Sequence, residues 1–134
     1  MKTFYLFLSV IAISFISCDK ESIAESFSVG LESNFKINYN YQSLDNSMDF
    51  TITEINDSRC PSDVVCIWEG KADVKIEVAS PVKGSIKLST YNHLLDTIGN
   101  YSFELIDVSP YPVSTKTIKL EDYDVTLKIL DLGN

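Results

Sequence analysis

Apolar and polar residues alternate along most of this chain, between residues 27 and 129. Such a period of two places every second side chain on the same face, as in a β-strand with one buried side. Residues 72–78 are a clear example, because Ala, Val, Ile and Val alternate there with Asp, Lys and Glu. No eleven-residue window shows the apolar stripe of an amphipathic helix. The pattern therefore predicts an all-β protein.

The strands predicted by this alternation are short and are separated by turn residues. They cover residues 27–31, 35–41, 48–52, 72–78, 86–88, 101–105 and 123–129, with a tight turn at 32–34 and an added edge strand at 116–120. Seven or eight short strands over about 110 positions are typical of an antiparallel two-sheet β-sandwich with immunoglobulin-like dimensions. A small closed barrel is the alternative.

The N-terminus has the pattern of an export signal. Lys2 precedes a run of thirteen mostly apolar residues, from Phe4 to Ile16. A helix of that length rises about 20 Å, which is too short for a hydrocarbon core of about 30 Å. We therefore expect residues 1–17 to be a cleaved signal peptide. An ordinary secretory peptide and a short anchor helix are the alternatives to the lipoprotein signal described next.

The segment Phe15-Ile16-Ser17-Cys18 resembles the lipobox of bacterial lipoproteins. The resemblance implies that Cys18 carries the lipid, including palmitate, and that it tethers the protein to the cell membrane through residues 18–25. A lipid on Cys18 also leaves the other two of the three cysteines free to pair. The domain is then expected at residues 26–134, in the cell envelope, at the outer membrane or cell surface rather than the inner membrane.

Charge limits the partners of the mature chain. The full chain has a formal net charge of −8, and removal of Lys2 with the signal peptide brings it near −9. Nucleic acid is excluded as a partner because phosphates would be repelled. Anionic headgroups would be repelled as well, so the membrane is reached through the lipid and not through a basic surface.

The ten residues from Arg59 to Trp68 hold the only arginine, the only tryptophan and two of the three cysteines. Cys60 and Cys66 can close a disulfide loop of seven residues, which by chain entropy stabilises the fold by about 2 kcal/mol. The stretch from Asp57 to Ala72 resembles a motif of small secreted bacterial proteins and lipoproteins of sandwich type, with the pattern D-S-R-C-P-x4-C-x-W-x-G. Residues 108–112, Val-Ser-Pro-Tyr-Pro, resemble a second piece of that pattern. The resemblance implies a fold and a compartment but no activity.

Two roles are open for this segment. In a structural role, Trp68 caps one end of the core and Arg59 pairs with Asp57 or Asp63. In a binding role, the disulfide holds Arg59 and Trp68 ready for a partner, since both residue types are favoured at binding hot spots. The preferred function is a non-catalytic binding or interaction module for a protein or carbohydrate ligand. The alternative of another class is a protease inhibitor that offers Arg59 to a protease cleft.

Catalytic and metal-binding patterns are weak. His93 is the only histidine, so no zinc site or histidine relay is predicted, and no cofactor is expected. A hydrolase with a carboxylate site is the least favoured function. Asp96-Thr97-Ile98 resembles the acceptor of a bacterial O-glycosylation system, which makes Thr97 a candidate modification site.

Overall fold

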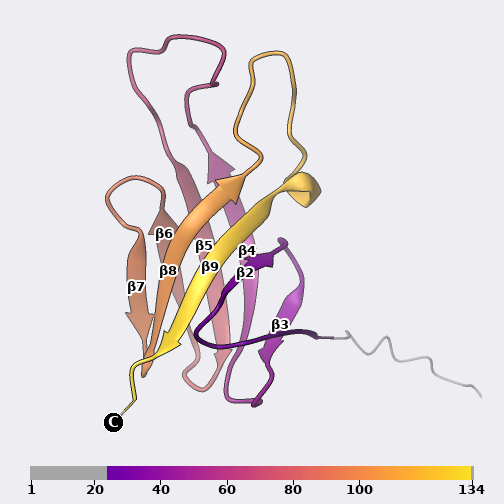
Figure 1. The fold of residues 1–134 in the computed structure, drawn as a ribbon, viewed down its shortest axis with the longest axis vertical. Helices are drawn as coiled ribbons and strands as arrows, with labels where there is room; N and C mark the ends of the chain where they lie inside the picture. The colour runs from indigo at the N-terminus through magenta and orange to yellow at the C-terminus, as the bar shows by residue number, and fades with distance from the viewer. Residues whose placement is uncertain (1–23, 134) are drawn as a thin grey trace, which may run out of the picture.

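The computed structural model describes residues 24–133. Their chain forms two facing sheets, and the topology is that of a β-sandwich (Figure 1). The strands are β1 (Glu25–Phe27), β2 (Glu32–Phe35), β3 (Asn40–Ser43), β4 (Asp49–Asp57), β5 (Ala72–Ser80), β6 (Gly84–Ser89), β7 (Leu95–Ile98), β8 (Tyr101–Ser109) and β9 (Asp124–Asp131), with a 3-10 turn, η1 (Leu120–Asp122), before β9. The all-β sandwich predicted from the alternation is confirmed.

One sheet has the strand order β1-β3-β4-β5-β6 and the other has the order β2-β9-β8-β7. All strand pairs are antiparallel except one, because β1 runs parallel to β3. The β1–β3 pair places Glu25 opposite Tyr41, and Tyr41 in turn lies opposite Phe50 near the start of β4. The N-terminal end of the described chain therefore lies level with the first residues of β4.

The space between the sheets is filled by the apolar half of the alternation. Twenty-two buried hydrophobic residues form one cluster that runs from Phe27 to Ile129. Aromatic rings fill the part of this cluster around the start of β4, where Phe50 contacts Phe27, Phe35 and Phe103 edge to face. Such edge contacts are the favoured geometry for packed rings.

The structure corrects several predicted boundaries near the N-terminus. Residues 28–31 form a turn and not part of a strand, because Gly30 adopts a positive φ of 93° there. Residues 32–34, predicted to be a turn, belong to β2. The predicted strand 35–41 is divided between the sheets, because Phe35 ends β2 in one sheet whereas Ile37 bridges Ile52 of β4 in the other. The positive φ of 65° at Asn38 then interrupts the extended backbone before β3. β1 begins at Glu25, inside the predicted tether.

Two further predictions are corrected. Residues 116–120 form no edge strand but lead through a loop into η1. β7 was not predicted, since Leu95 and Thr97 on one of its faces are exposed and its alternation carries no apolar signal. The described residues thus contain nine strands instead of seven or eight.

Three loops lie together at one end of the sandwich. They connect β4 to β5 (58–71), β6 to β7 (90–94) and β8 to β9 (110–123). Figure 1 shows the first and third of them extending beyond the ends of their strands. We call this end, formed by residues 58–71, 90–94 and 110–123, the loop end. The segment from Arg59 to Trp68 lies at this end. Glu25 lies at the other end of the sandwich, beside the start of β4.

Candidate functional site

Arg59 ties the loop end to both sheets. Its guanidinium donates from Nε to Asp57 Oδ1 over 2.8 Å and from Nη2 to Asp57 Oδ2 over 2.6 Å, a bidentate pair. Nη1 donates to the backbone oxygen of Val108 over 2.7 Å, and Nη2 donates to that of Pro110 over 3.2 Å. The ring of Tyr111 lies 4.5 Å from the guanidinium carbon, in cation–π contact. One side chain thereby joins β4, the end of β8 and the loop that follows it.

The ion pair between Arg59 and Asp57 is buried, and each charge is balanced by its partner. The Asp57 side chain is 3% exposed, and Tyr123 donates its hydroxyl to Asp57 Oδ2 over 3.0 Å. Burial alone would raise the pKa of Asp57, but the hydrogen bonds and charge of Arg59 outweigh it, and the pKa falls below its ordinary value. Burial and the hydrogen bond to Asp57 raise the pKa of Tyr123 to about 12. Arg59 and Asp57 are therefore both charged at neutral pH.

This geometry bears on the predicted role of Arg59. The sequence left Asp57 and Asp63 open as partners, and the structure selects Asp57. Arg59 is only 8% exposed, whereas an inhibitor that inserts this side chain into a protease cleft needs it in solvent. The expectation that the loop presents Arg59 is therefore wrong. The buried guanidinium holds the loop from beneath.

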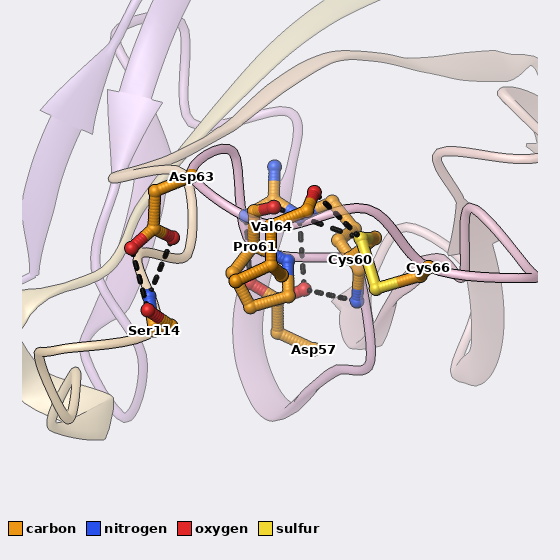
Figure 2. The surroundings of a disulfide bond; sticks show 8 residues. Asp57, Cys60, Pro61, Asp63, Val64, Cys66 and Ser114 are labelled. Carbon is orange, nitrogen blue, oxygen red and sulfur yellow. Dashed lines mark hydrogen bonds and ion pairs between the residues drawn. A yellow bond between two sulfur atoms is a disulfide. The ribbon is translucent and has the colours of Figure 1, made fainter.

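The predicted disulfide between Cys60 and Cys66 is present, with a Cα–Cα distance of 5.9 Å. The loop that it closes is also fastened to the β8–β9 loop, as Figure 2 shows. Asp63 accepts hydrogen bonds from the backbone N–H and the hydroxyl of Ser114, and the N–H of Ser62 donates to the Pro112 oxygen. The two hydrogen bonds from Ser114 lower the pKa of Asp63. Asp63 is thus occupied within the protein.

The base of the same loop continues the β4–β5 pairing beyond the ends of the strands. The N–H of Ser58 donates to the Lys71 oxygen over 2.8 Å, and the N–H of Cys60 donates to the Glu69 oxygen over 2.7 Å. Gly70 has a φ of 69°, and a Cβ added to it would collide with the carbonyl oxygen of Ser58. Only glycine permits this close approach. The loop therefore has a narrow, well-bonded neck.

Above this neck the loop carries exposed apolar side chains. Trp68 is 82% exposed, Val65 and Ile67 are almost fully exposed, and Val64 is exposed as well. We call Val64, Val65, Ile67 and Trp68 the apolar tip. The structural alternative in which Trp68 caps the core is wrong, because the core ends below the neck. The disulfide and the hydrogen bonds to residues 112–114 hold the apolar tip in solvent.

Two adjoining hollows lie beside the apolar tip. We call the first the aromatic hollow. It measures about 600 Å³ and is lined mainly by Ile67, Trp68 and Tyr91, with Ser58, Glu69 and Lys71. We call the second the acidic hollow. It measures about 460 Å³ and includes Glu69, Tyr91, Leu94, Ile106, Asp107 and Tyr111, with Arg59 in its wall.

The acidic hollow depends on an irregularity in β8. The pairing of β8 with β9 shifts register between Leu105 and Asp107, so that Ile106 is an extra residue in the strand. Such a bulge re-aims side chains, and here both Ile106 and Asp107 are exposed. Sequence reasoning missed Asp107, Tyr91 and Leu94 because nothing in their spacing links them to the Arg59 segment. The Pro-Tyr-Pro loop was the one signal that pointed to Tyr111.

The remaining predicted sites lie elsewhere. Cys18 is outside the described residues. Thr97 is exposed on β7, and the ring of His93 lies 3.4 Å from Asp96 on the surface. Within residues 24–133, no group of three or more His, Cys, Asp or Glu side chains is arranged to hold a metal ion. Over the same residues, no helix has the length and apolar character needed to cross a membrane.

Comparisons with protein-family models, with curated proteins and with solved structures found no match for this chain.

Proposed function

We propose that this protein is a lipid-anchored protein of the bacterial cell envelope, and that its loop end is a non-catalytic binding surface. The observation that carries the proposal is the apolar tip, which is exposed and yet held firmly from below. Exposed aliphatic and aromatic side chains cost solubility, and a contiguous group of them is typical of an interaction site. The disulfide, the Arg59 network and the neck at Gly70 all fix the backbone that carries this group.

Rigidity gives this surface an energetic advantage in binding. Ordering a loop on association costs free energy, and a loop that is already ordered avoids that cost. Burial of a side chain of the size of Ile67 or Trp68 contributes about 2 kcal/mol. The apolar tip therefore has the two properties expected of a binding hot spot, a large apolar area and a fixed geometry.

The proposed anchor would direct the loop end away from its own membrane. Glu25 is seven positions after Cys18, so the tether spans at most about 24 Å. Glu25 lies level with Phe50, and Asp57 is about 20 Å further along β4, with the apolar tip beyond it. Only a fully extended tether lying along the domain would let the apolar tip reach the bilayer. A partner in the surrounding compartment is therefore favoured over the anchoring membrane.

A protein partner fits the surface better than a carbohydrate. A sugar site pairs a flat ring with free hydrogen-bonding groups, whereas the other exposed side chains of the apolar tip, Val64, Val65 and Ile67, are aliphatic. The inhibitor alternative loses its support because Arg59 is buried, and no observation favours the hydrolase. The exposed position of Thr97 on β7 is compatible with the proposed O-glycosylation. A hexose-containing adduct on the peptide that includes Thr97 would support that modification in a mass spectrum of the native protein.

Site-specific crosslinking in intact cells tests the binding surface. A photoreactive residue at Ile67 should give discrete adducts that disappear when Trp68→Ala is added. The same photoreactive residue at Leu44, which is 68% exposed between β3 and β4, is the matched control. Equal adducts from both positions, or none from position 67, would contradict the proposal.

The anchor is tested by the intact mass of protein extracted from membranes. The expected species begins at Cys18 and carries the mass of the acyl chains. An unmodified cysteine, or a chain that retains residues 1–17, would contradict the lipoprotein assignment.

A further inference from the structure

The acidic hollow has an unbalanced negative charge. Arg59 is in its wall, but the charge of Arg59 is matched by Asp57 beneath it. Glu69 and Asp107 line the same hollow, and within residues 24–133 neither carboxylate forms an ion pair. Tyr91 and Tyr111 add aromatic rings to this hollow. Carboxylates beside aromatic rings attract a cation, both by charge and through the negative face of the ring.

The aromatic hollow favours an apolar group instead. Ile67, Trp68 and Tyr91 form its apolar surface. Two of its polar neighbours are already occupied, because the hydroxyl of Ser58 donates to the Lys71 oxygen and the ammonium of Lys71 lies 3.2 Å from Asp73. Glu69, which it shares with the acidic hollow, is the polar neighbour that forms no ion pair within residues 24–133. Such a hollow provides area for an aliphatic or aromatic side chain and few free polar groups for a sugar.

The two hollows adjoin, since Glu69, Gly70 and Tyr91 line both of them. A single short segment can therefore occupy both. We infer that the loop end binds a peptide segment of a partner protein that carries a basic side chain close to a large apolar one, with the basic group in the acidic hollow and the apolar group in the aromatic hollow. This inference rests on the proposed function and specifies the chemistry of the partner.

Charge complementarity selects this occupant over two others. A second copy of this chain carries the same net negative charge, −8 for the full chain, so two copies repel each other as they approach. An anionic membrane surface is repelled for the same reason. A basic and apolar segment of a protein gains from both hollows, and electrostatic steering raises its association rate.

A random twelve-residue peptide library displayed on phage, selected on the purified protein as the cell makes it, tests this inference. We expect the selected peptides to contain Lys or Arg near Trp, Phe, Leu or Ile. A synthetic peptide of the selected sequence should bind about thirtyfold or more weakly to Trp68→Ala, as expected for the loss of a hot spot. It should bind about tenfold more weakly to the double variant Glu69→Gln/Asp107→Asn, because two exposed charges are lost.

Two matched control variants show whether the loss of peptide binding is specific to the loop end or follows from any loss of exposed apolar area or charge. Leu44→Ala removes an exposed apolar side chain outside the loop end, and Glu54→Gln/Asp131→Asn removes the same number of exposed charges. Both should bind the peptide as the unmodified protein does. Added salt should weaken binding to the unmodified protein more than binding to Glu69→Gln/Asp107→Asn.

The outcomes distinguish this inference from the proposed function. Selected peptides without basic residues would overturn the inference, and so would peptides that bind Glu69→Gln/Asp107→Asn as tightly as the unmodified protein. If those peptides still bind Trp68→Ala more weakly, the proposed binding surface itself is retained. Failure to select any peptide, with retention on a glycan array or on phosphatidylcholine vesicles instead, would also overturn it. The crosslinking experiment at Ile67 then decides separately whether the apolar tip binds a partner at all.

Discussion

Replacing Arg59 with Met tests the buried ion pair, because Met keeps an apolar stem and removes only the guanidinium. The change leaves the Asp57 carboxylate, 3% exposed, without its counter-charge. It also removes the donors to the backbone oxygens of Val108 and Pro110. Removing one partner of a buried, hydrogen-bonded ion pair costs about 3–5 kcal/mol. We expect a loss of about 4 kcal/mol in the free energy of unfolding at pH 7, out of a total of about 10 kcal/mol for a domain of this size.

Urea unfolding followed by far-ultraviolet circular dichroism measures this loss. Lys36→Met is the matched control, since the ammonium of Lys36 lies 3.1 Å from Asp124 and both side chains are 39% exposed. Exposed pairs contribute about 0–1 kcal/mol, so this variant should unfold close to the midpoint of the unmodified protein. The difference between the two variants isolates the effect of burial.

The pH dependence provides a second, independent readout. In the unmodified protein the pKa of Asp57 lies below its ordinary value of 3.8, so its stabilising contribution is complete above that pH and is lost as the pH falls through the lower folded value. In Arg59→Met the guanidinium no longer opposes burial, and the pKa of Asp57 rises above its ordinary value. Protonation then relieves the unpaired charge. We therefore expect the gap between Arg59→Met and the unmodified protein to narrow between pH 7 and pH 5.

A gap below about 1 kcal/mol at pH 7 would refute the argument, because the pair would then behave like an exposed one. A gap of the expected size that does not change with pH would refute the electrostatic explanation. It would mean that lost packing, and not the unpaired carboxylate, is the cause of the instability.

Three further predictions concern the loop that carries the apolar tip. The fluorescence of Trp68, the only tryptophan, should be red-shifted and readily quenched by acrylamide, and a blue-shifted, protected emission would contradict its 82% exposure. The double variant Cys60→Ser/Cys66→Ser should lose about 2 kcal/mol in urea unfolding, and an unchanged midpoint would mean that the hydrogen bonds alone order the loop. Gly70→Ala should lower the melting temperature more than Gly30→Ala does. Both glycines have positive φ, but a Cβ meets the backbone only at Gly70, so equal shifts would refute a tight neck.

The strands were predictable wherever one face is buried and the other is exposed to solvent. Val74 and Ile76 on β5 are fully buried, whereas Lys75 between them and Glu77 after them are not, and this contrast is the alternation seen in the sequence. Sheet membership was not predictable, because a strand in either sheet has the same period. The chain changes sheet between Phe35, the last residue of β2, and Ile37, which bridges Ile52 of β4, and the unbroken apolar pattern around them hides this change.

The candidate site was predictable only in part. The unusual composition of residues 59–68 marked the segment, and the cysteine spacing indicated the disulfide that is present. The direction of each side chain was not predictable, since Arg59 turns inward to Asp57 while Trp68 turns outward. Tyr91 joins the site because the topology brings three loops to the same end, and Asp107 joins it because the bulged end of β8 lies beside them.

The loop between β4 and β5 separates two tasks that many loops combine. Its underside holds the fold together through Arg59, and its outer residues contribute nothing to the core. Mutations at Val64, Val65, Ile67 or Trp68 therefore change the surface offered to a partner at little cost in stability, as exposed loop positions usually allow. In evolutionary terms, this protein can alter its binding preference by single substitutions and keep its scaffold. Library-based redesign of the same four positions can exploit the same freedom.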